Sequence, residues 1–486
     1  MRLTELLDGI RTLSPWEDME ISGVTADSAR VTFGNLFVCV RGEHRDGHQF
    51  AAEAIQKGAR MLITERRTGD FPQILVENSR DAYGLLCRNF YHHPEKKLHL
   101  FGITGPNGKT TTAHILSHLL EYAGERVGMT GTVCHKIAGR QIPSHYTTPT
   151  PEELYALLDE MVQAGCTCCV SEASSQALEQ GRMQGLHFFC GIYTNLTEDH
   201  LDVHHDMEAY FQAKKKLFSM TPRAVISLND TWGQRLAKEI SCQTLTLSRD
   251  ASGDYRLAEE SSSLDGTTFT LEKSGEKIRF TSPLPGQYNS ENAACALLAA
   301  REYGISFSTL QRGLTCVPPV RGRLEKIPTG KDFALFLDYA HTPDGLEKAL
   351  TALRDLQSGR LVCLFGCGGD RDRKKRPQMG EIAAKYSDFV ILTSDNPRSE
   401  APRAILQDIL VGLRETETPY AVIENREKAI AFAIQSAQKG DVILLAGKGH
   451  ETYQVLHIGK IPFDERKITA EWLDRADQLR PTNGGY

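Results

Sequence analysis

A glycine-rich segment between an apolar run and a helical pattern constrains this chain most. Residues 98–104 are largely apolar and read as a buried strand, residues 105–112 read Gly-Pro-Asn-Gly-Lys-Thr-Thr-Thr, and a helical pattern continues to about Tyr122. Strand, glycine loop and helix in this order are typical of a phosphate-binding loop, because the backbone N–H groups and the new helix end face phosphate oxygens. We therefore predict that Lys109 reaches the β- and γ-phosphates of a nucleotide and that a following threonine hydroxyl binds Mg²⁺.

The loop is a variant of the common spacing. The pattern G-x-x-x-x-G-K would require glycine at position 103, which is Ile103, and the nearest glycines are Gly102 and Gly105. The alternative is a glycine-rich turn with a solvated lysine. The strand before the loop and the helix after it favour phosphate binding.

An acidic side chain is expected near such a loop. Glu172 ends an apolar strand predicted over residues 168–172, and doubly wound sheets place ligand groups at that end of a strand. A carboxylate there can bind Mg²⁺ directly or through water. The alternative is a surface glutamate just past the strand.

A histidine-rich segment follows the next predicted strand. One interpretation is a zinc site built on His200, His204 and His205, and the other is a metal-and-phosphate loop of an ATPase. Cys166 and Cys169 have a C-x-x-C spacing, but they lead into an apolar strand and no second pair has finger spacing, which disfavours structural zinc. We predict that His204 and His205 are solvated loop histidines.

The three consecutive lysines at 214–216 lie in a helical run, and composition alone predicts a solvated basic face. The basic run at 368–377 likewise reads, on composition alone, as a surface loop.

The segment from 250 to 277 is polar and poor in core residues, and we predict an irregular β excursion there. An alanine-rich helix is predicted over 290–303 and a proline-containing linker near 315–325.

Length and composition bound the architecture and the class of partner. The 486 residues suit about three domains of ~150 residues each. Strands alternate with helices after residue 98 and again after about 326, which predicts parallel α/β units. The net charge of −6 disfavours a broad nucleic-acid-binding face. No apolar run approaches the ~20 residues of a membrane span, and the N-terminus lacks the apolar region of a secretory signal.

Twelve cysteines are too few in a chain of this length for a disulfide scaffold. Several lie in apolar runs, among them Cys168, Cys169 and Cys363, and we predict that they are small buried hydrophobic residues. These features predict a reduced, cytoplasmic protein.

Further motifs occur in a single order along the chain. They are YTTPTPEEL, EASSQALEQGR, TNLTEDHLDVHHDMEAYFQAKKKLF, GQYNSENAACALLAA, RGRLE, LDYAHTPDGLEKAL, FGCGGDRDRKKRPQMG, DNPRSE and AGKGHETYQ. With the glycine loop, they resemble the Mur ligases of peptidoglycan synthesis over nearly the whole chain, and in particular the diaminopimelate-adding members. The N-terminal DSARVTFGNLFVCVRGEHRDGHQF also fits the nucleotide-sugar domain of that family.

The resemblance implies an α/β fold of three domains. Residues 1–97 would form a smaller α/β domain for the UDP-sugar, 98–325 a central P-loop-type parallel sheet domain for ATP, and 326–486 a Rossmann-like domain for the incoming amino acid. It also implies the reaction. ATP would phosphorylate the D-glutamate carboxylate of UDP-N-acetylmuramoyl-L-alanyl-D-glutamate, and the amine of meso-diaminopimelate would displace phosphate from the acyl phosphate. ATP and Mg²⁺ are the implied cofactors, and we expect a monomer.

The resemblance also implies roles for individual residues. The implied ATP contacts are Gly105, Asn107, Gly108, Lys109, Thr110, Thr111, Asn195, Asn292 and Arg323. The implied metal ligands are Thr110, Glu172, His200 and Lys214, the last as a carbamate. The implied catalytic residues are Lys109, His200, Lys214, Asp338 and His341. The implied contacts of the UDP-muramoyl dipeptide are Ser28, Thr147, Thr148, Ser174, Gln180 and Arg182. The implied diaminopimelate contacts are Arg371, Asp395, Asn396, Arg398, Gly447 and Glu451.

Within the diaminopimelate set, Arg398 would pair with the distal carboxylate that lysine lacks, and Glu451 would face an ammonium group. The chain departs from the family pattern at three positions: Ala29 follows Ser28 where arginine is usual, Pro106 replaces a common threonine and removes an N–H, and Gln176 replaces a usual histidine. The alternatives are a lysine-adding relative, a folylpolyglutamate synthase-like ligase, and a switch that hydrolyses nucleotide only to change shape.

Overall fold

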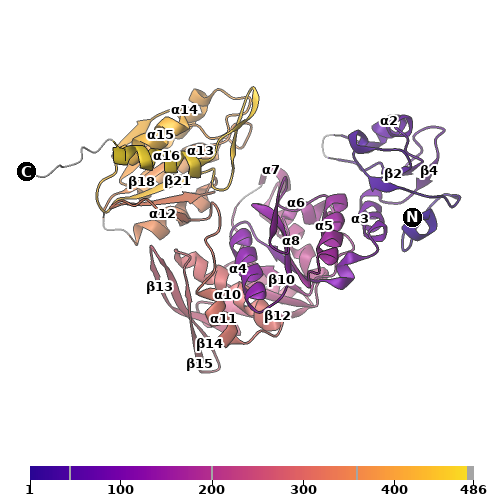
Figure 1. The fold of residues 1–486 in the computed structure, drawn as a ribbon, viewed down its shortest axis with the longest axis horizontal. Helices are drawn as coiled ribbons and strands as arrows, with labels where there is room; N and C mark the ends of the chain where they lie inside the picture. The colour runs from indigo at the N-terminus through magenta and orange to yellow at the C-terminus, as the bar shows by residue number, and fades with distance from the viewer. Residues whose placement is uncertain (43–44, 199–200, 357–358, 479–486) are drawn as a thin grey trace, which may run out of the picture.

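The computed structural model describes residues 1–42, 45–198, 201–356 and 359–478. It is an elongated molecule of three α/β units, with the N-terminal unit at one end, the C-terminal unit at the other and the largest sheet between them (Figure 1). The predicted α/β class is confirmed. The domain boundaries stay a prediction; the third sheet begins at Glu325, one residue before the predicted start of the last domain.

The N-terminal unit is a four-stranded parallel sheet in the order β1-β2-β3-β4, covered by short helices. Its elements are α1 Leu3–Leu6, β1 Gly23–Thr25, η1 Ser28–Arg30, β2 Asn35–Val38, η2 Gly47–Phe50, α2 Ala51–Gln56, β3 Met61–Thr64, β4 Gln73–Leu75, α3 Ser79–Phe90 and η3 Pro94–Lys97.

The central unit holds an 11-stranded sheet. Its elements are β5 His99–Thr104, α4 Lys109–Tyr122, β6 Val127–Thr130, β7 Cys134–Ile137, β8 Arg140–Pro143, α5 Pro151–Gln163, β9 Cys168–Glu172, α6 Ser175–Glu179, β10 Cys190–Tyr193, α7 Leu201–His204, α8 Met207–Lys215, η4 Lys216–Ser219, β11 Arg223–Ser227, α9 Thr231–Glu239, β12 Gln243–Ser248, β13 Tyr255–Ser263, β14 Gly266–Lys273, β15 Glu276–Ser282, α10 Gln287–Glu302 and α11 Phe307–Leu314.

Strand order in this sheet decides where a ligand can bind. The order is β15-β14-β13-β12-β11-β10-β5-β9-β6-β7-β8, and the seven strands from β13 to β6 run parallel. Strands β5 and β9 are buried along almost their whole length, as expected of parallel strands with helices on both faces. Because parallel strands end at one edge, the loops after β5, β9 and β10 meet there.

The polar segment predicted to be an irregular excursion is regular β structure. Strands β13, β14 and β15 form an antiparallel meander, with one register irregularity between Ala258 and Ser261. The alternation hides its core residues from a composition count, because one face is polar while Phe269, Leu271 and Phe280 are buried on the other.

The C-terminal unit is a six-stranded sheet in the order β16-β17-β21-β18-β19-β20, parallel except for β16. Strands β22 and β23 form a separate two-stranded antiparallel sheet. The elements of the C-terminal unit are β16 Glu325–Ile327, β17 Ala334–Asp338, α12 Pro343–Arg354, β18 Leu361–Phe365, α13 Lys375–Tyr386, β19 Phe389–Leu392, α14 Pro402–Leu413, β20 Tyr420–Val422, α15 Arg426–Gln435, β21 Val442–Ala446, β22 Tyr453–Leu456, β23 Gly459–Pro462 and α16 Glu465–Gln478.

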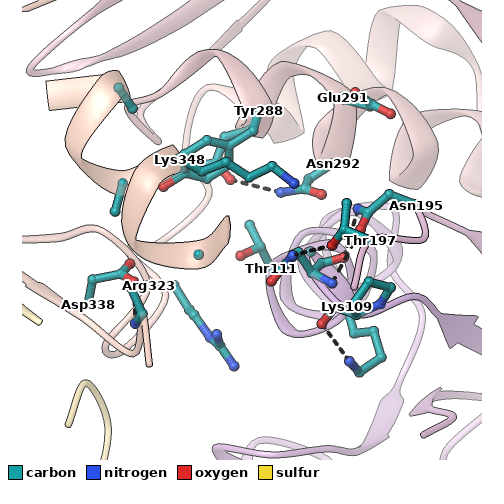
Figure 2. Close-up of a pocket in the computed structure, with 18 of the residues that line it drawn as sticks. Lys109, Thr111, Asn195, Thr197, Tyr288, Glu291, Asn292, Arg323, Asp338 and Lys348 are labelled. Atoms are coloured by element: carbon teal, nitrogen blue, oxygen red, sulfur yellow. Dashed lines mark hydrogen bonds between the residues drawn. The ribbon is translucent and has the colours of Figure 1, made fainter. Parts of the chain in front are cut away.

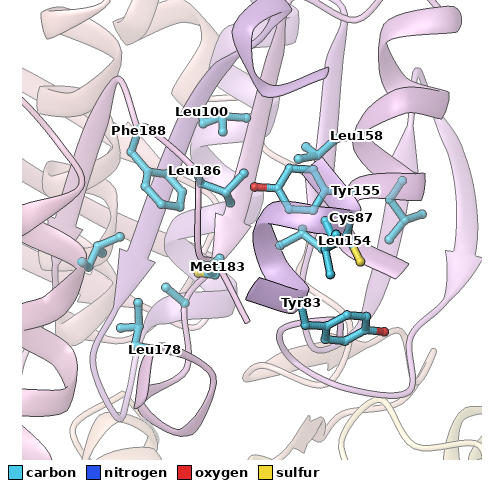
Figure 3. Close-up of a cluster of buried hydrophobic side chains, with 14 of the residues drawn as sticks. Tyr83, Cys87, Leu100, Leu154, Tyr155, Leu158, Leu178, Met183, Leu186 and Phe188 are labelled. Atoms are coloured by element: carbon cyan, nitrogen blue, oxygen red, sulfur yellow. The ribbon is translucent and has the colours of Figure 1, made fainter. Parts of the chain in front are cut away.

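One hydrophobic core joins the N-terminal and central units. Figure 3 shows Tyr83 and Cys87 of α3 beside Leu154, Tyr155 and Leu158 of α5. These five side chains belong to a buried cluster that extends from α1 to α9. The two units therefore share one continuous apolar core.

The buried cysteines follow the prediction. Cys168, Cys169 and Cys363 have no exposed surface. Within the described ranges, no helix combines the length and the apolar character needed to cross a membrane.

Candidate functional site

A cavity of about 780 Å³ lies between the central and C-terminal units. Figure 2 shows the glycine loop with Lys109 and Thr111 on one side of it, and Arg323 and Asp338 on the other. Helix α10 contributes Asn292 to the lining, and α12 closes the remaining side. The cavity is thus placed at the edge of the central sheet where β5, β9 and β10 end.

Backbone geometry explains the glycines of the loop. Gly105 and Gly108 have φ of +146° and +86°, and a Cβ on either would collide, with Thr194 and with the Asn292 amide respectively. Helix α4 begins at Lys109, so its first N–H groups face the cavity. Lys109 Nζ donates to the carbonyl oxygens of Gly105 at 2.7 Å and Pro106 at 3.0 Å. The loop therefore has the backbone shape of a phosphate-binding site, and the Lys109 side chain lies across it.

Glu172 is fully buried beside the loop, which excludes the surface-glutamate alternative. Its Oε2 accepts hydrogen bonds from Thr110 Oγ1 at 3.0 Å and Thr132 Oγ1 at 2.9 Å, and its Oε1 accepts from the Thr132 N–H at 2.9 Å. Among the described residues, no lysine or arginine lies within ion-pair distance of this carboxylate. A buried anion beside hydroxyl groups and a phosphate loop suits Mg²⁺, which prefers oxygen ligands.

A cation from the linker approaches the same point. Arg323 Nη2 donates to Thr110 Oγ1 at 3.1 Å, and its guanidinium lies 5.0 Å from the centre of the Tyr339 ring. Asp338 holds the linker by accepting from the backbone N–H groups of Leu324 and Ala340. Burial raises the pKa of Asp338, and the nearby Arg323 opposes that shift. The contacts of Asp338 therefore fix the backbone next to Arg323.

The C-terminal unit touches the phosphate loop directly. Asn107 Nδ2 donates to Asp344 Oδ2 of α12 at 2.6 Å, and Lys348 Nζ donates to the same oxygen at 2.9 Å. On the other side, Asn195 Nδ2 donates to the Asn107 carbonyl oxygen at 3.1 Å. Sequence reasoning missed Asp344, since an acid in the first turn of a helix needs no further role than its favourable place on the helix dipole.

The remaining predicted nucleotide residues also line the cavity. Asn292 Nδ2 donates to Asn289 Oδ1 at 3.0 Å, which fixes its amide beside Gly108. His341 is exposed, and its ring centre lies 4.6 Å from that of Tyr339. The structure therefore brings the predicted ATP contacts into one cavity.

The solvated basic face predicted from composition is wrong for Lys214. Helix α8 turns Lys214 inward, where 2% of the residue is exposed and its Nζ lies 4.3 Å from the centre of the Tyr210 ring. Lys215 is half-buried and Lys216 is exposed. His200, the other predicted ligand of a second metal, lies outside the described residues.

The two neighbouring histidines differ from each other. His204 was expected in solvent but ends α7 and is buried, with Nε2 2.9 Å from Ser175 Oγ and its ring stacked on Tyr210 at 4.9 Å. The aromatic neighbour comes from α8, so a local pattern does not reveal it. His205 is exposed, as predicted.

The predicted dipeptide contacts of the central unit form one cluster at the end of β9. Thr148 Oγ1 donates to the Glu172 carbonyl oxygen at 2.7 Å and accepts from the Ser174 N–H at 3.0 Å. Arg182 donates to the Thr148 carbonyl oxygen at 3.1 Å and to Gln180 Oε1 at 2.7 Å. Glu172 therefore joins this cluster, through its carbonyl oxygen, to Thr110 of the cavity, through its carboxylate.

Thr132 connects the two parts of the site. Its Oγ1 lies 3.1 Å from Thr147 Oγ1 and donates to Glu172 Oε2. Thr132 carries no charge and belongs to no motif, so only its place after β6, which pairs with β9, could have indicated it.

Ser28 stands apart on η1 of the N-terminal unit. This segment is held to the start of α5 because Arg30 forms an ion pair with Glu152 at 2.9 Å and Thr25 Oγ1 donates to the same carboxylate at 2.9 Å. The arginine that stands one position later than in the family pattern thus has a structural partner. Among the described residues, no hydrogen bond or ion pair joins Ser28 to the cluster of Thr147, Thr148, Ser174, Gln180 and Arg182.

The predicted amino-acid residues meet where β18, β19 and β21 end. Arg398 Nη1 donates to the Gly369 carbonyl oxygen at 2.7 Å, and Arg371 is an exposed neighbour across Gly368. Arg398 and Asp370 both have left-handed backbones, with φ of +52° and +53°. Such backbone strain persists only where the surrounding contacts enforce it, and it is frequent at binding sites.

The opposite wall of this site is polar and close-packed. Asn396 Nδ2 donates to Glu451 Oε2 at 2.9 Å. Gly447 has φ of +107°, and a Cβ there would lie 2.6 Å from Asp395 Oδ2, so glycine is needed for both reasons. All six predicted diaminopimelate residues therefore belong to one region of the C-terminal unit.

Two buried cations support this region, and sequence reasoning missed both. Arg376, expected on a surface loop, is fully buried on α13, where it bonds to Glu400 at 2.7 Å and Asp408 at 2.8 Å. Arg376 lies at helical spacing from Met379 and from the small residues that follow. This spacing could have indicated that Arg376 lies on the buried face of a helix. Lys448 is fully buried as well; it lies in the AGKGHETYQ motif, but composition and spacing there do not separate a buried lysine from a surface one.

Three models of one protein family together match most of the chain. Residues 20–91 match the family model described as "Mur ligase family, catalytic domain", residues 103–300 match "Mur ligase middle domain", and residues 322–449 match "Mur ligase, glutamate ligase domain".

Individual relatives are similar over nearly their full length. A UDP-N-acetylmuramoyl-L-alanyl-D-glutamate–2,6-diaminopimelate ligase of Caldanaerobacter subterraneus subsp. tengcongensis is 41% identical, with 98% of this chain and 100% of the relative covered. A protein of the same name from Gloeobacter violaceus is 43% identical, with 98% of each chain covered.

Solved structures agree with these relatives. The structure of a UDP-N-acetylmuramoyl-L-alanyl-D-glutamate–2,6-diaminopimelate ligase superposes with a TM-score of 0.72 at 32% identity, covering 98% of this chain and 99% of the other. The MurF ligase of Thermotoga maritima in complex with ADP shares the fold, with a TM-score of 0.64 at 20% identity and coverage of 94% and 98%.

Proposed function

Since the chain belongs to the Mur ligase family, we propose that it joins 2,6-diaminopimelate to UDP-N-acetylmuramoyl-L-alanyl-D-glutamate, with conversion of ATP to ADP and phosphate. One observation in this chain supports diaminopimelate as the amino-acid substrate. Arg398, held by the Gly369 carbonyl, and Glu451, held by Asn396, stand in a single region at the ends of parallel strands. A guanidinium and a carboxylate there match a substrate end that bears both a carboxylate and an ammonium group.

The phosphate loop supplies the first half of the chemistry. Its N–H groups and Lys109 bind the β- and γ-phosphates, which lowers the repulsion between ATP and the substrate carboxylate. The carboxylate oxygen attacks the γ-phosphorus, ADP leaves, and an acyl phosphate forms on the D-glutamate side chain. Arg323 reaches the same place from the linker and offsets the negative charge that develops during the transfer.

The second half joins the amine to the activated carbonyl. The unprotonated amine of the amino acid attacks the acyl phosphate, and the tetrahedral adduct collapses to an amide as phosphate leaves. Arg398 and Glu451 bind the distal end of the substrate, so the reacting amine is directed toward the central unit. Asn195 and Lys109 stay on the phosphate that departs.

Thr110 and Glu172 would hold one Mg²⁺, because a hydroxyl group and a buried carboxylate that has no basic partner among the described residues meet beside the loop. When bound, the ion supplies positive charge to the phosphates. His200 and Lys214 are proposed for a second ion, with Lys214 as a carbamate. Loss of activity in Lys214→Ala, recovered by a short carboxylic acid, would support the carbamate, whereas full activity of that variant would contradict it.

The dipeptide is proposed to extend from Ser28 to the cluster of Thr147, Thr148, Ser174, Gln180 and Arg182. The hydrogen bonds from Thr147 through Thr132 to Glu172 support this placement, since they link the cluster to the nucleotide cavity. The proposed enzyme acts as a cytoplasmic monomer.

The testing experiment measures ADP release with a panel of amino acids. We expect release only when ATP, the UDP-muramoyl dipeptide and meso-diaminopimelate are all present, and at least ~100-fold lower kcat/KM with L-lysine, because lysine leaves Arg398 unpaired. Equal turnover of L-lysine would favour the lysine-adding alternative. Folate-dependent turnover would favour a folylpolyglutamate synthase, and nucleotide hydrolysis without substrates would favour a switch.

A further inference from the structure

A fully buried ammonium group lies behind the proposed amino-acid site. Lys448 follows β21, and neither its side chain nor its backbone is exposed. Its Nζ donates to Asn396 Oδ1 at 3.0 Å and to Glu451 Oε2 at 2.7 Å. An ammonium buried without such partners would be strongly unfavourable, so these two bonds account for its presence there.

The hydrogen bonds determine how the Asn396 amide is oriented. Its Oδ1 accepts from Lys448 Nζ and from the Val455 N–H at 2.9 Å, and both are donors that can face only an oxygen. Asn396 Nδ2 must therefore be the atom that faces Glu451 Oε2. Lys448 thus decides which end of this amide is presented to the carboxylate.

The same bonds divide the two oxygens of Glu451. Oε2 accepts from both Lys448 and Asn396, whereas Oε1 accepts no hydrogen bond from the described part of the chain. The Glu451 side chain is 12% exposed, compared with 0% for Lys448. The inner oxygen is therefore committed to the protein, and the outer one is available to a ligand.

On the basis of the proposed function, we propose that Lys448 is a positioning residue for the amino-acid substrate. It fixes Asn396 and the inner oxygen of Glu451, so that the outer oxygen faces the substrate ammonium in one orientation. Without Lys448, the Glu451 carboxylate loses its strongest inner partner and can rotate, and the Asn396 amide loses one of the two donors that orient it. The substrate would then pay the ordering entropy on binding.

The experiment compares Lys448→Met with Lys460→Met. Lys460 is a matched control, since its Nζ lies 4.1 Å from the centre of the Tyr453 ring that Lys448 also approaches at 5.7 Å, but Lys460 is exposed. We expect Lys448→Met to raise the KM for meso-diaminopimelate by ~10–100-fold, as for loss of a charge-assisted hydrogen bond, with the KM for ATP within ~2-fold. Lys460→Met should leave both constants unchanged. An equal rise in both KM values for Lys448→Met would overturn the proposal.

A double-variant cycle with Glu451→Gln separates positioning from a general structural role. If Lys448 acts through Glu451, the double variant has the same amino-acid KM as Glu451→Gln alone. Effects that multiply would show that Lys448 acts independently and would overturn the proposal. Lys448→Gln serves if the methionine variant fails to fold: it keeps one donor, so an intermediate KM is expected, and a wild-type KM would overturn the proposal.

The same cycle keeps the two proposals apart. If the wild-type enzyme ligates another amino acid and not diaminopimelate, the proposed function fails. Lys448 is then tested with the amino acid that is accepted, and a KM unchanged by Lys448→Met overturns the positioning role on its own.

Discussion

The nucleotide cavity and the amino-acid site are built in opposite ways. The cavity is bounded by two units of the molecule, and its polar groups bind one another across it, as in the bonds from Asn107 to Asp344 and from Arg323 to Thr110. The amino-acid site lies within one unit, and buried cations hold its loops from behind. Hydrogen bonds within the protein must break when a ligand enters the nucleotide cavity. The side chains of the amino-acid site are already arranged to bind a ligand.

This difference predicts different sensitivities. Ligand binding in the cavity competes with hydrogen bonds between two units. A substitution that changes the charge at this interface should therefore either raise or lower the affinity for nucleotide. Binding in a preorganised site loses affinity whenever the arrangement is disturbed.

Lys109→Met should have the largest effect. It removes the cation that spans the phosphate loop, and we expect kcat to fall by ~10³-fold, while the KM for the amino acid stays within ~3-fold. Steady-state ADP release measures both constants. Lys136→Met is the control, because Lys136 pairs with Glu121 at 2.7 Å away from the cavity. A loss of less than tenfold would place the phosphates elsewhere.

Arg398→Lys should raise the KM for meso-diaminopimelate by ~100-fold. Lysine keeps the charge, but it cannot bond Gly369 and present a planar donor pair to a carboxylate at the same time. The KM for ATP should not change, because the site lies within one unit. Arg403→Lys, at a side chain that is 88% exposed, is the matched control. A comparable rise in the KM for ATP would show that the two sites are not separate.

Asp344→Asn should lower the KM for ATP, by up to ~10-fold. The variant retains a side chain that can bond Asn107, but it removes a negative charge from the phosphate loop. The KM for the amino acid serves as the internal control and should not change. A higher KM for ATP would mean that Asp344 assists the bound nucleotide instead of competing with it.

Glu400→Gln should have the smallest effect, which concerns stability. The hydrogen bond from Arg376 holds the pKa of Glu400 at about 2, below its usual 4.5. A carboxyl group with a lowered pKa stabilises the fold above its unfolded pKa and loses that contribution as the pH falls from 4.5 toward 2. We expect the variant to melt ~2–4 °C lower at pH 7, with a smaller difference near pH 2, in scans of the C-terminal transition. An unchanged difference across that range would show that the charge of Glu400 is not involved.

The apolar strands were predictable because their signal is local. The strand predicted over 168–172 agrees with β9 to the residue, and the apolar run at 98–104 contains β5 at 99–104. The motifs also placed the predicted residues of the central unit after these strands, although their individual roles stay predictions.

What the sequence could not reveal is which charged side chains are buried. Lys214, His204 and Arg376 look like solvated groups, and all three are buried. His204 contacts Ser175 and Arg376 pairs with Glu400, in each case a residue from another segment. Asp344 and Thr132 are ordinary in their local sequence and gain importance only from the strand order. Burial of a charge is set by tertiary contacts, which a one-dimensional pattern does not contain.

The core shared by α3 and α5 has a consequence for how the protein unfolds. Tyr83 and Cys87 lose their apolar surroundings if α5 opens, and Leu154 and Leu158 lose theirs if α3 detaches, so the first two units should melt together. The C-terminal unit has separate clusters made almost entirely of its own residues. A three-part enzyme therefore contains two cooperative folding blocks, and a fragment cut near residue 320 should keep its fold where one cut near residue 97 would expose an apolar face.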